Sequence, residues 1–373
     1  MEIPKNSEEQ QYRDELAKNI VTEKNVLERR KVLESAKETR KYWESRFFKV
    51  MERRHGEGLE TDEAIPAEML LREYEEKSIN QEGEKLKFLA GDNDVYNISS
   101  PLEIAGKKYI AGRIENRNEW ASSKVFFFTE QNGNWVKDDE APTLNIEDPF
   151  YAKIGDEIVI GGVKAWWPVS GEDVRWKTIF YRGSNLNNLK EFSKSPAGMK
   201  DVRLIDLEDG TIGVFTRPRR TIAGHGKIGF TRINNLDELT PENIIHAKIL
   251  KNQFIPEEWG GVNQATLLED GKVGVLGHIA AHDDRGDKHY YAVSFVLDPK
   301  TFECTKMKII ATRTEFPEGE MKVHYPEKPN ELADVIFPGG LIRNNNKTAT
   351  IYCGLSDCEG GKLTIKDPFI EKE

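Results

Sequence analysis

The sequence has 373 residues, of which 38% are hydrophobic and 32% are charged, a balance typical of ordinary globular proteins. Its formal net charge is -10, and acidic and basic residues are interspersed, so the chain lacks the broad basic surface that neutralises a nucleic-acid backbone. The first residues lack the apolar run of a secretory signal, and no stretch approaches the roughly 20 apolar residues that cross a bilayer. We therefore predict no nucleic-acid partner and no membrane partner.

The cysteines indicate the compartment. Cys304, Cys353 and Cys358 are too few and too oddly counted for a disulfide framework, and no Cys/His cluster has the spacing of a zinc site. These residues predict reduced thiols in a cytoplasmic protein with no metal site. No motif indicates a bound cofactor.

The N-terminal part of the chain predicts helices. Residues 7–54 are almost free of Gly and Pro and repeat apolar residues at helical intervals, as in one long amphipathic helix or two consecutive ones. Pro66 then opens a second helical run that ends near Ser78. We interpret residues 1–80 as a helical segment for docking or for homo-oligomerisation. A coiled coil fits less well, because the apolar spacing drifts from a strict heptad.

From about residue 86 the sequence changes to short β-branched and aromatic runs separated by Gly, Asn and Asp, which predicts an all-β region. Five of these runs resemble equivalent inner strands, each with a central glycine. The glycines are Gly112, Gly162, Gly213, Gly274 and Gly354. Their spacing predicts a five-bladed β-propeller over residues 86–373, with the helical segment as an N-terminal extension. A β-sandwich is the alternative, but it explains five similar strands less well.

The last interval between these glycines is long enough to hold an insertion, residues 315–334, on the binding face. Polar and charged residues lie beside the glycines, and the inner strands of a propeller line one central funnel. A single Arg or His on a strand is more often structural, so the argument depends on their convergence. Trp166 and Trp167 are adjacent and precede Pro168, so at least one should reach the pocket rim, where an indole can stack on a bound ring. For Trp259 we favour packing.

Long matches in a fixed order resemble a known family. The stretches MKDVRLIDLEDGTIGVFTRPR, EWGGVNQ, GVLGHIAAHD and LSDCEGGKLTIKDPF resemble the bacterial family called domain of unknown function 1861. More distantly, the same region is similar to the five-bladed β-mannoside phosphorylases and hydrolases of glycoside hydrolase family 130. The resemblance implies a bacterial carbohydrate-active propeller that works on a β-mannoside or a related oligosaccharide or small glycoside.

The resemblance also implies roles for individual residues. Asp148 aligns with the aspartate of the Glu-Asp-Pro-Arg motif, the proposed general acid of that family, although an Asp-Pro pair is also a common turn. The predicted substrate-binding residues are Asn97, Arg113, Glu115, Trp166, Asp201 and Asp357. The predicted phosphate- or anion-binding residues are Lys200, Arg203, Arg217 and His278.

This arrangement predicts inverting cleavage, in which protonated Asp148 assists the leaving oxygen while a nucleophile attacks the opposite face of the sugar. Converging cations suit inorganic phosphate as a co-substrate, and water is the alternative nucleophile. One departure weakens the case for phosphate, because Phe150 stands where the phosphorylase motif has Arg. A non-catalytic sugar-binding or regulatory propeller therefore stays open as the alternative function.

Overall fold

The computed structural model describes residues 36–40, 64–77, 81–117, 123–166, 175–218, 225–324 and 327–370. Strands predominate in these ranges, which confirms the mostly β character predicted from residue 86 onward. Residues 36–40 are helical, and the named helices are α3 (Ala67–Glu75), α4 (Pro241–Ile245) and the single-turn η1 (Leu186–Asn188), η2 (Leu236–Glu238) and η3 (Arg313–Glu315). The rest of the helix predicted over residues 7–54 lies outside the described residues, so the oligomerisation role stays a prediction.

The first sheet has six strands in the order β2-β7-β6-β5-β3, with β4 paired to β5. Its strands are β2 (Phe88–Leu89), β3 (Asn93–Tyr96), β4 (Leu102–Ile104), β5 (Lys107–Asn116), β6 (Lys124–Gln131) and β7 (Asn134–Lys137). Neighbours in this sheet are antiparallel except for β2 and β7, which pair in parallel. Val95, Ile110 and Phe128 form part of a buried cluster on this sheet.

Two four-stranded sheets follow, with the orders β11-β10-β9-β8 and β12-β13-β14-β15. Their strands are β8 (Glu147–Ile154), β9 (Glu157–Trp166), β10 (Arg175–Gly183), β11 (Lys190–Lys194), β12 (Arg203–Asp206), β13 (Ile212–Thr216), β14 (Gly229–Ile233) and β15 (Lys248–Ile249). Each strand pairs antiparallel with its neighbour in the sequence, so both sheets are simple meanders.

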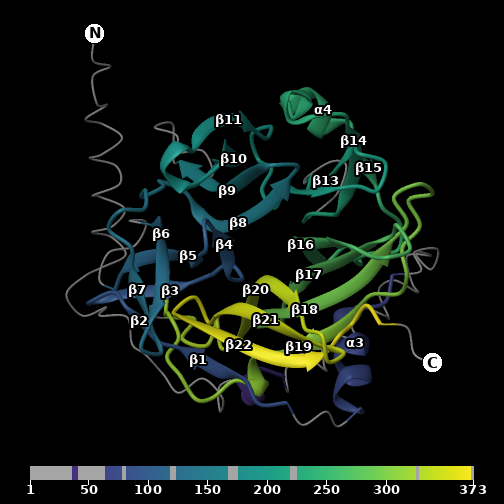
Figure 1. Cartoon of the computed structure of the whole chain (residues 1–373). Coiled ribbons are helices and arrows are strands. Elements are labelled where there is room, and N and C mark those ends of the chain that lie inside the picture. Colours follow the sequence, from purple (N-terminus) through teal and green to yellow (C-terminus); the bar gives the residue numbers. More distant parts are fainter. Residues whose placement is uncertain are drawn as a thin grey trace.

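The remaining strands form one eight-stranded sheet in the order β1-β22-β21-β20-β18-β17-β16, with β19 paired to β18. They are β1 (Glu84–Leu86), β16 (Glu258–Leu267), β17 (Val273–His282), β18 (Lys288–Leu297), β19 (Lys308–Ala311), β20 (Asp334–Arg343), β21 (Thr348–Leu355) and β22 (Glu359–Lys366). The strands follow one another around a common centre in chain order (Figure 1), and β1 pairs with β22, so the two ends of the β region meet.

The glycine-bearing runs are not the inner strands, so that part of the prediction was wrong. The five glycines lie on β5, β9, β13, β17 and β21, each of which is second in its meander. The first strands β8, β12, β16 and β20 instead contact one another around the centre. Each of the five glycines lies where another part of the chain approaches closely, and at Gly112 and Gly213 the neighbours include a side chain of the first strand. A Cβ atom on Gly112 would lie 2.9 Å from Val95 Cγ1, and one on Gly213 would lie 3.0 Å from Ile205 Cγ2.

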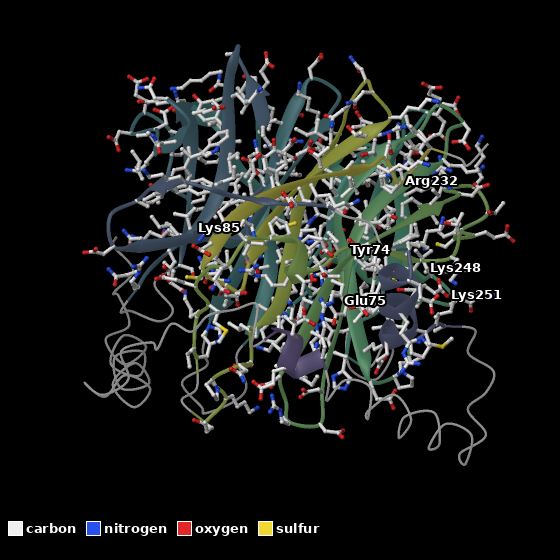
Figure 2. All side chains as sticks on the ribbon, turned by 90° about the horizontal axis from the view of Figure 1, so that it is seen from below. Tyr74, Glu75, Lys85, Arg232, Lys248 and Lys251 are labelled. Carbon is white, nitrogen blue, oxygen red and sulfur yellow. The ribbon has the colours of Figure 1, made fainter. Side chains whose placement is uncertain are left out.

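The predicted helix after Pro66 is present as α3, which packs against the eight-stranded sheet (Figure 2). Leu70, Leu71 and Tyr74 of this helix join the largest buried cluster, together with residues of β16 to β19. The three cysteines are free thiols. Among the described helices, none is long and apolar enough to cross a membrane.

Candidate functional site

Four of the predicted site residues share an unusual backbone conformation. The φ angles are 45° at Asn97, 50° at Asp148, 60° at Asp201 and 50° at Asp357, all in the left-handed region. Asn and Asp tolerate this region better than other non-glycine residues, because their short polar side chains bond locally. The same strained geometry therefore occurs in four separate parts of the fold, and such strain concentrates at functional sites.

The first half of the site is the acidic cluster, which consists of Asn97, Arg113, Glu115, Glu147 and Asp148. Asn97 Nδ2 donates to Asp148 Oδ1 at 2.8 Å, and Arg113 Nη1 donates to the same oxygen at 3.1 Å. Arg113 Nη1 also lies 3.4 Å from Glu147 Oε2. A β-bulge between Glu147 and Phe150 turns both carboxylates out of the regular register of β8. Two donors thus occupy Oδ1 of Asp148, and none in the described chain is bonded to its Oδ2.

Glu115 lies behind this pair and is almost fully buried. Its Oε1 accepts from Ser123 Oγ at 2.6 Å, and its Oε2 accepts from Tyr96 Oη at 2.8 Å and pairs with the Lys322 ammonium. Burial alone would raise the pKa of Glu115, but Arg113 and Lys322 hold that pKa well below its usual range. Glu115 is therefore a fixed negative charge.

Glu147 behaves differently, because burial raises its pKa above the ordinary value and Arg113 offsets this only in part. The negative charge of Asp148 adds to the rise. The surroundings of Glu147 thus favour its protonated form more than water does.

The second half is the cationic cluster, which consists of Lys200, Asp201, Arg203, Arg217, Asn263 and His278. Arg217 Nη1 lies 2.6 Å from Asp201 Oδ2, and Arg203 Nη2 lies 3.9 Å from Asp201 Oδ1. Burial alone would raise the pKa of Asp201. The positive charges of Arg217 and Lys200 outweigh burial and hold this pKa below its usual range. Arg217 Nε is buried and has no hydrogen-bond partner in the described part of the chain. A buried donor without a partner is rare and invites a ligand or an ordered water.

His278 contributes a neutral ring. Its side chain is buried, and burial together with the nearby arginines lowers its pKa to about 3. His278 Nδ1 lies 2.8 Å from Asn263 Oδ1, and the ring stacks on Tyr290 with centroids 5.7 Å apart. At neutral pH this histidine therefore offers hydrogen bonds to a ligand and adds no positive charge.

Arg203 has two of its three nitrogens bound to backbone carbonyls. Nε donates to the Asn263 carbonyl at 2.9 Å and Nη1 donates to the Val202 carbonyl at 3.2 Å. Its guanidinium lies 4.0 Å from the ring centroid of Phe150, the residue that departs from the phosphorylase motif. Burial lowers the pKa of Arg203 to about 10. Phe150 is thus a buried support for Arg203.

The two clusters adjoin. Lys200 is half-buried, and its charge acts on Glu147 on one side and on Asp201 and His278 on the other. The charge of Asp148 likewise acts on Arg203. Within the described ranges no hydrogen bond occupies the Lys200 ammonium. An acidic patch and a cationic patch therefore meet in one site.

The other predicted residues are placed less centrally. Asp357 is half-buried near Tyr96 and His324. Trp166 ends β9, and both its side chain and Trp167 lie outside the described residues. Trp259 is buried and donates to Tyr290 Oη at 2.7 Å, so its predicted packing role is confirmed.

Sequence reasoning missed Lys322 and Asn263. Lys322 lies in the predicted insertion, which was the available signal, whereas nothing local singles out Asn263. The described His, Cys, Asp and Glu residues form no group that could hold a metal ion.

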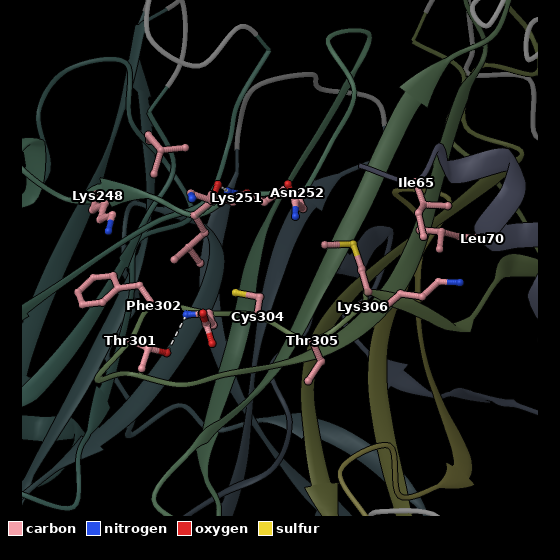
Figure 3. Close-up of a pocket in the computed structure, with 15 residues that line it drawn as sticks. Ile65, Leu70, Lys248, Lys251, Asn252, Thr301, Phe302, Cys304, Thr305 and Lys306 are labelled. Carbon is pink, nitrogen blue, oxygen red and sulfur yellow. Dashed lines mark hydrogen bonds between the residues drawn. The ribbon is translucent and has the colours of Figure 1, made fainter. Parts of the chain in front are cut away.

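One cavity adjoins the cationic cluster, and another lies apart from both clusters. A cavity of about 320 Å³ is lined by β8, β12 and β16 and reaches Phe150, Arg203 and Asn263. A second, of about 570 Å³, lies at the start of α3, where Lys248, Lys251 and Lys306 border it (Figure 3). Lys306 is already paired with Glu73, and none of the predicted site residues lines this second pocket.

Known proteins resemble this chain in sequence and in fold. Residues 72–371 match the model of a family described as "Protein of unknown function (DUF1861)". A mannose phosphorylase from Leishmania mexicana, solved with a phosphate ion, is 35% identical, with 81% of this chain and 93% of that chain covered and a TM-score of 0.73. A GDP-Man-dependent mannosyltransferase from the same organism is 34% identical, with 80% and 93% covered and a TM-score of 0.71.

A β-1,2-mannobiose phosphorylase from Listeria innocua is 13% identical, with 75% of this chain and 92% of that chain covered and a TM-score of 0.53, which shows a shared fold. No curated protein matches the chain. The bacterial source and the cytoplasmic location stay predictions.

Proposed function

The chain belongs to the DUF1861 family, and from this premise we propose that it is a β-mannoside phosphorylase that uses Asp148 as general acid and inorganic phosphate as co-substrate. The observation that carries the proposal is the meeting of the two clusters. Asp148 is held by Asn97 and Arg113 on one side, and the unpartnered Nε of Arg217 lies in the cationic cluster on the other.

The charge distribution supports phosphate as the nucleophile. The cationic cluster holds three positive side chains and one carboxylate, Asp201. Since His278 is neutral, the net charge of the cluster is positive. Lys200 and Arg217 retain donors for an anion, and charge-assisted hydrogen bonds to phosphate are among the stronger ones. Phe150 does not remove this capacity, because it packs beneath Arg203.

The proposed step balances as follows. Asp148 gives the proton on Oδ2 to the glycosidic oxygen as the bond from that oxygen to the anomeric carbon breaks. A phosphate oxygen forms the new bond to the anomeric carbon from the opposite face, which gives a sugar 1-phosphate with inverted configuration and a shortened saccharide. The proton carried by the attacking phosphate then returns to Asp148.

We also infer that the scaffold is a five-bladed propeller. The eight-stranded sheet divides where β18 and β20 pair over two residues only, His289 with Asp334 and Tyr290 with Val335. Its halves are then β16 to β19 and β20 to β22 with β1, which match the meanders of the other sheets. This division supports five blades, the first with six strands and the other four with four strands each.

Mannosyl transfer from a sugar nucleotide is the second candidate. The GDP-Man-dependent relative is 34% identical and the phosphorylase relative is 35% identical, so identity does not separate them. The same cations suit a diphosphate leaving group.

The test is to incubate the purified chain with β-manno-oligosaccharides, with and without phosphate, and separately with GDP-mannose and mannose. We expect mannose 1-phosphate to form only when phosphate is present. Asp148→Asn should lower turnover by about 10²-fold or more. The control is Asp139→Asn, at an exposed carboxylate paired with Lys137.

The other outcomes assign other functions. Release of mannose from the oligosaccharides without phosphate would indicate a hydrolase. A product formed only in the incubation with GDP-mannose and mannose would indicate a transferase. Saccharide binding without any turnover would leave the non-catalytic sugar-binding function.

A further inference from the structure

The described part of the insertion predicted over residues 315–334 is anchored to the body of the molecule near residues 321–323, which are buried. Lys322 N donates to the Ser356 carbonyl at 3.1 Å, and Arg313 Nη1 donates to the Pro317 carbonyl at 3.2 Å. Met321 is fully buried beside Lys322. These contacts fix the position of the Lys322 backbone.

The Lys322 side chain is only 1% exposed, which is unusual for a lysine. Its ammonium pairs with Glu115 Oε2, lies 3.4 Å from Tyr96 Oη and lies 3.9 Å from Asp94 Oδ2. The ammonium also stands over the Tyr96 ring, 4.6 Å from its centroid. Burial of this charge is tolerated because carboxylates surround it.

Arg113 is shared among three carboxylates. Its Nη2 lies 3.4 Å from Glu115 Oε1, and its Nη1 lies 3.4 Å from Glu147 Oε2 and 3.1 Å from Asp148 Oδ1. One guanidinium cannot neutralise three carboxylates, so the charge of Glu115 competes with the other two for Arg113. The Lys322 ammonium neutralises Glu115 from the opposite side and reduces that competition.

We propose that Lys322 is a positioning residue for the general acid, acting through Glu115 and Arg113 to keep Arg113 on Asp148. The proposal rests on the function proposed above. The insertion would then complete the active site from a part of the chain distant in sequence, joining β5 and β8 into one charged network.

Other polar and charged groups also face Asp148 and affect the pH dependence of the reaction. Asn97 and Arg113 contact Asp148 directly, and Lys200 and Arg203 act on this region from the segment at the start of β12. Lys322 contacts none of these cations. Its removal therefore reaches Asp148 through Arg113, by way of Glu115 and of Tyr96, whose hydroxyl donates to Glu115 and whose ring lies under the Arg113 guanidinium.

The experiment compares wild type with Lys322→Met in the phosphate-dependent assay over a range of pH. We expect kcat to fall by about 10²-fold, the scale of an ångström-sized misplacement, while KM for phosphate changes by less than about threefold. The alkaline limb of the pH profile should move to higher pH, because Arg113 would turn toward Glu115 and leave the proton donor without its cation. A crystal structure of the variant should show Arg113 Nη1 withdrawn from Asp148.

Two further variants separate positioning from folding. Lys288→Met removes another ion pair to the insertion, Lys288 with Glu331 at 2.8 Å, and should alter the thermal midpoint without moving the pH profile. The double variant Lys322→Met with Glu115→Gln removes both charges of the pair, so it should fold, and its crystal structure should show Arg113 Nη1 on Asp148 as in the wild type.

The inference is overturned if Lys322→Met keeps the wild-type kcat, if Lys288→Met gives the same change in pH profile, or if Arg113 stays on Asp148 in the variant crystal. If wild type itself turns over no substrate, the proposed function fails, and the position of Arg113 in that crystal still decides the role of Lys322.

Discussion

Arg40 ties the described part of the N-terminal segment to the β region, and its loss should destabilise the whole fold. Its Nε and Nη2 donate to the two oxygens of Asp334 at 3.0 and 2.8 Å, and its Nη1 pairs with Glu75 of α3 at 2.9 Å. Asp334 is fully buried at the first position of β20. Removing Arg40 would leave that carboxylate without its bidentate partner.

The structure sets the expected magnitude. Removing one partner of a buried ion pair costs about 3–5 kcal/mol, because the other charge is left uncompensated. Asp334 would keep two donors, His289 Nδ1 at 2.9 Å and Tyr291 Oη at 2.6 Å, so we expect Arg40→Met to cost about 3 kcal/mol. Urea unfolding at neutral pH measures this loss. The control, Lys306→Met, breaks the exposed pair between Lys306 and Glu73 of α3 and should cost less than about 1 kcal/mol.

The pH dependence of the same pair gives a second measurement. Burial raises the pKa of Asp334, but Arg40 and His289 lower it to a net value below the usual range. A carboxyl group with a lowered folded-state pKa stabilises the protein above its unfolded pKa of about 3.9, and that stability is lost as the pH falls further. The difference between wild type and Arg40→Met should therefore shrink below about pH 4. A loss under about 1 kcal/mol, or a loss that does not vary with pH, would refute the reasoning.

Further predictions concern the site and the thiols. Because burial lowers the pKa of His278 to about 3, NMR of its ring should show no titration between pH 5 and pH 8. Gly261→Ala should weaken phosphate binding measured by calorimetry, because the new Cβ would lie 3.1 Å from both Asp201 and His278. Burial raises the pKa of Cys304 to about 12 and that of Cys353 above its usual range, so neither should react quickly with a thiol reagent at pH 7.5 in the folded protein.

The fold was largely predictable, because hydrophobic periodicity is a local property. The change from helical to alternating patterns near residue 86, and the helix after Pro66, both occur as predicted. The position of the glycine-bearing strands was not predictable in the same way. A glycine such as Gly112 shows that a neighbour packs closely, but the neighbour, Val95, is identified only when the pairing of β3 with β5 is known.

Several residues named from the motifs lie close together in the structure, whereas the two residues that sequence reasoning missed make long-range contacts. Arg113 lies next to both Asp148 and Glu115, and Arg217 lies next to Asp201, as convergence of the strands requires. Lys322 is 207 residues from Glu115 in sequence, so no local pattern could connect the two.

The geometry of Asp148 is compatible with both interpretations, a turn residue and a catalytic acid. Asp148 adopts φ 50° at a bulge before Pro149, as a turn residue would, and this geometry also directs its carboxylate to Asn97 and Arg113. An alanine at this position would combine backbone strain with loss of the carboxylate. Asn tolerates the left-handed region, so Asp148→Asn removes the acid while keeping the turn. A loss of turnover in that variant without a change in thermal midpoint can then be assigned to the missing proton.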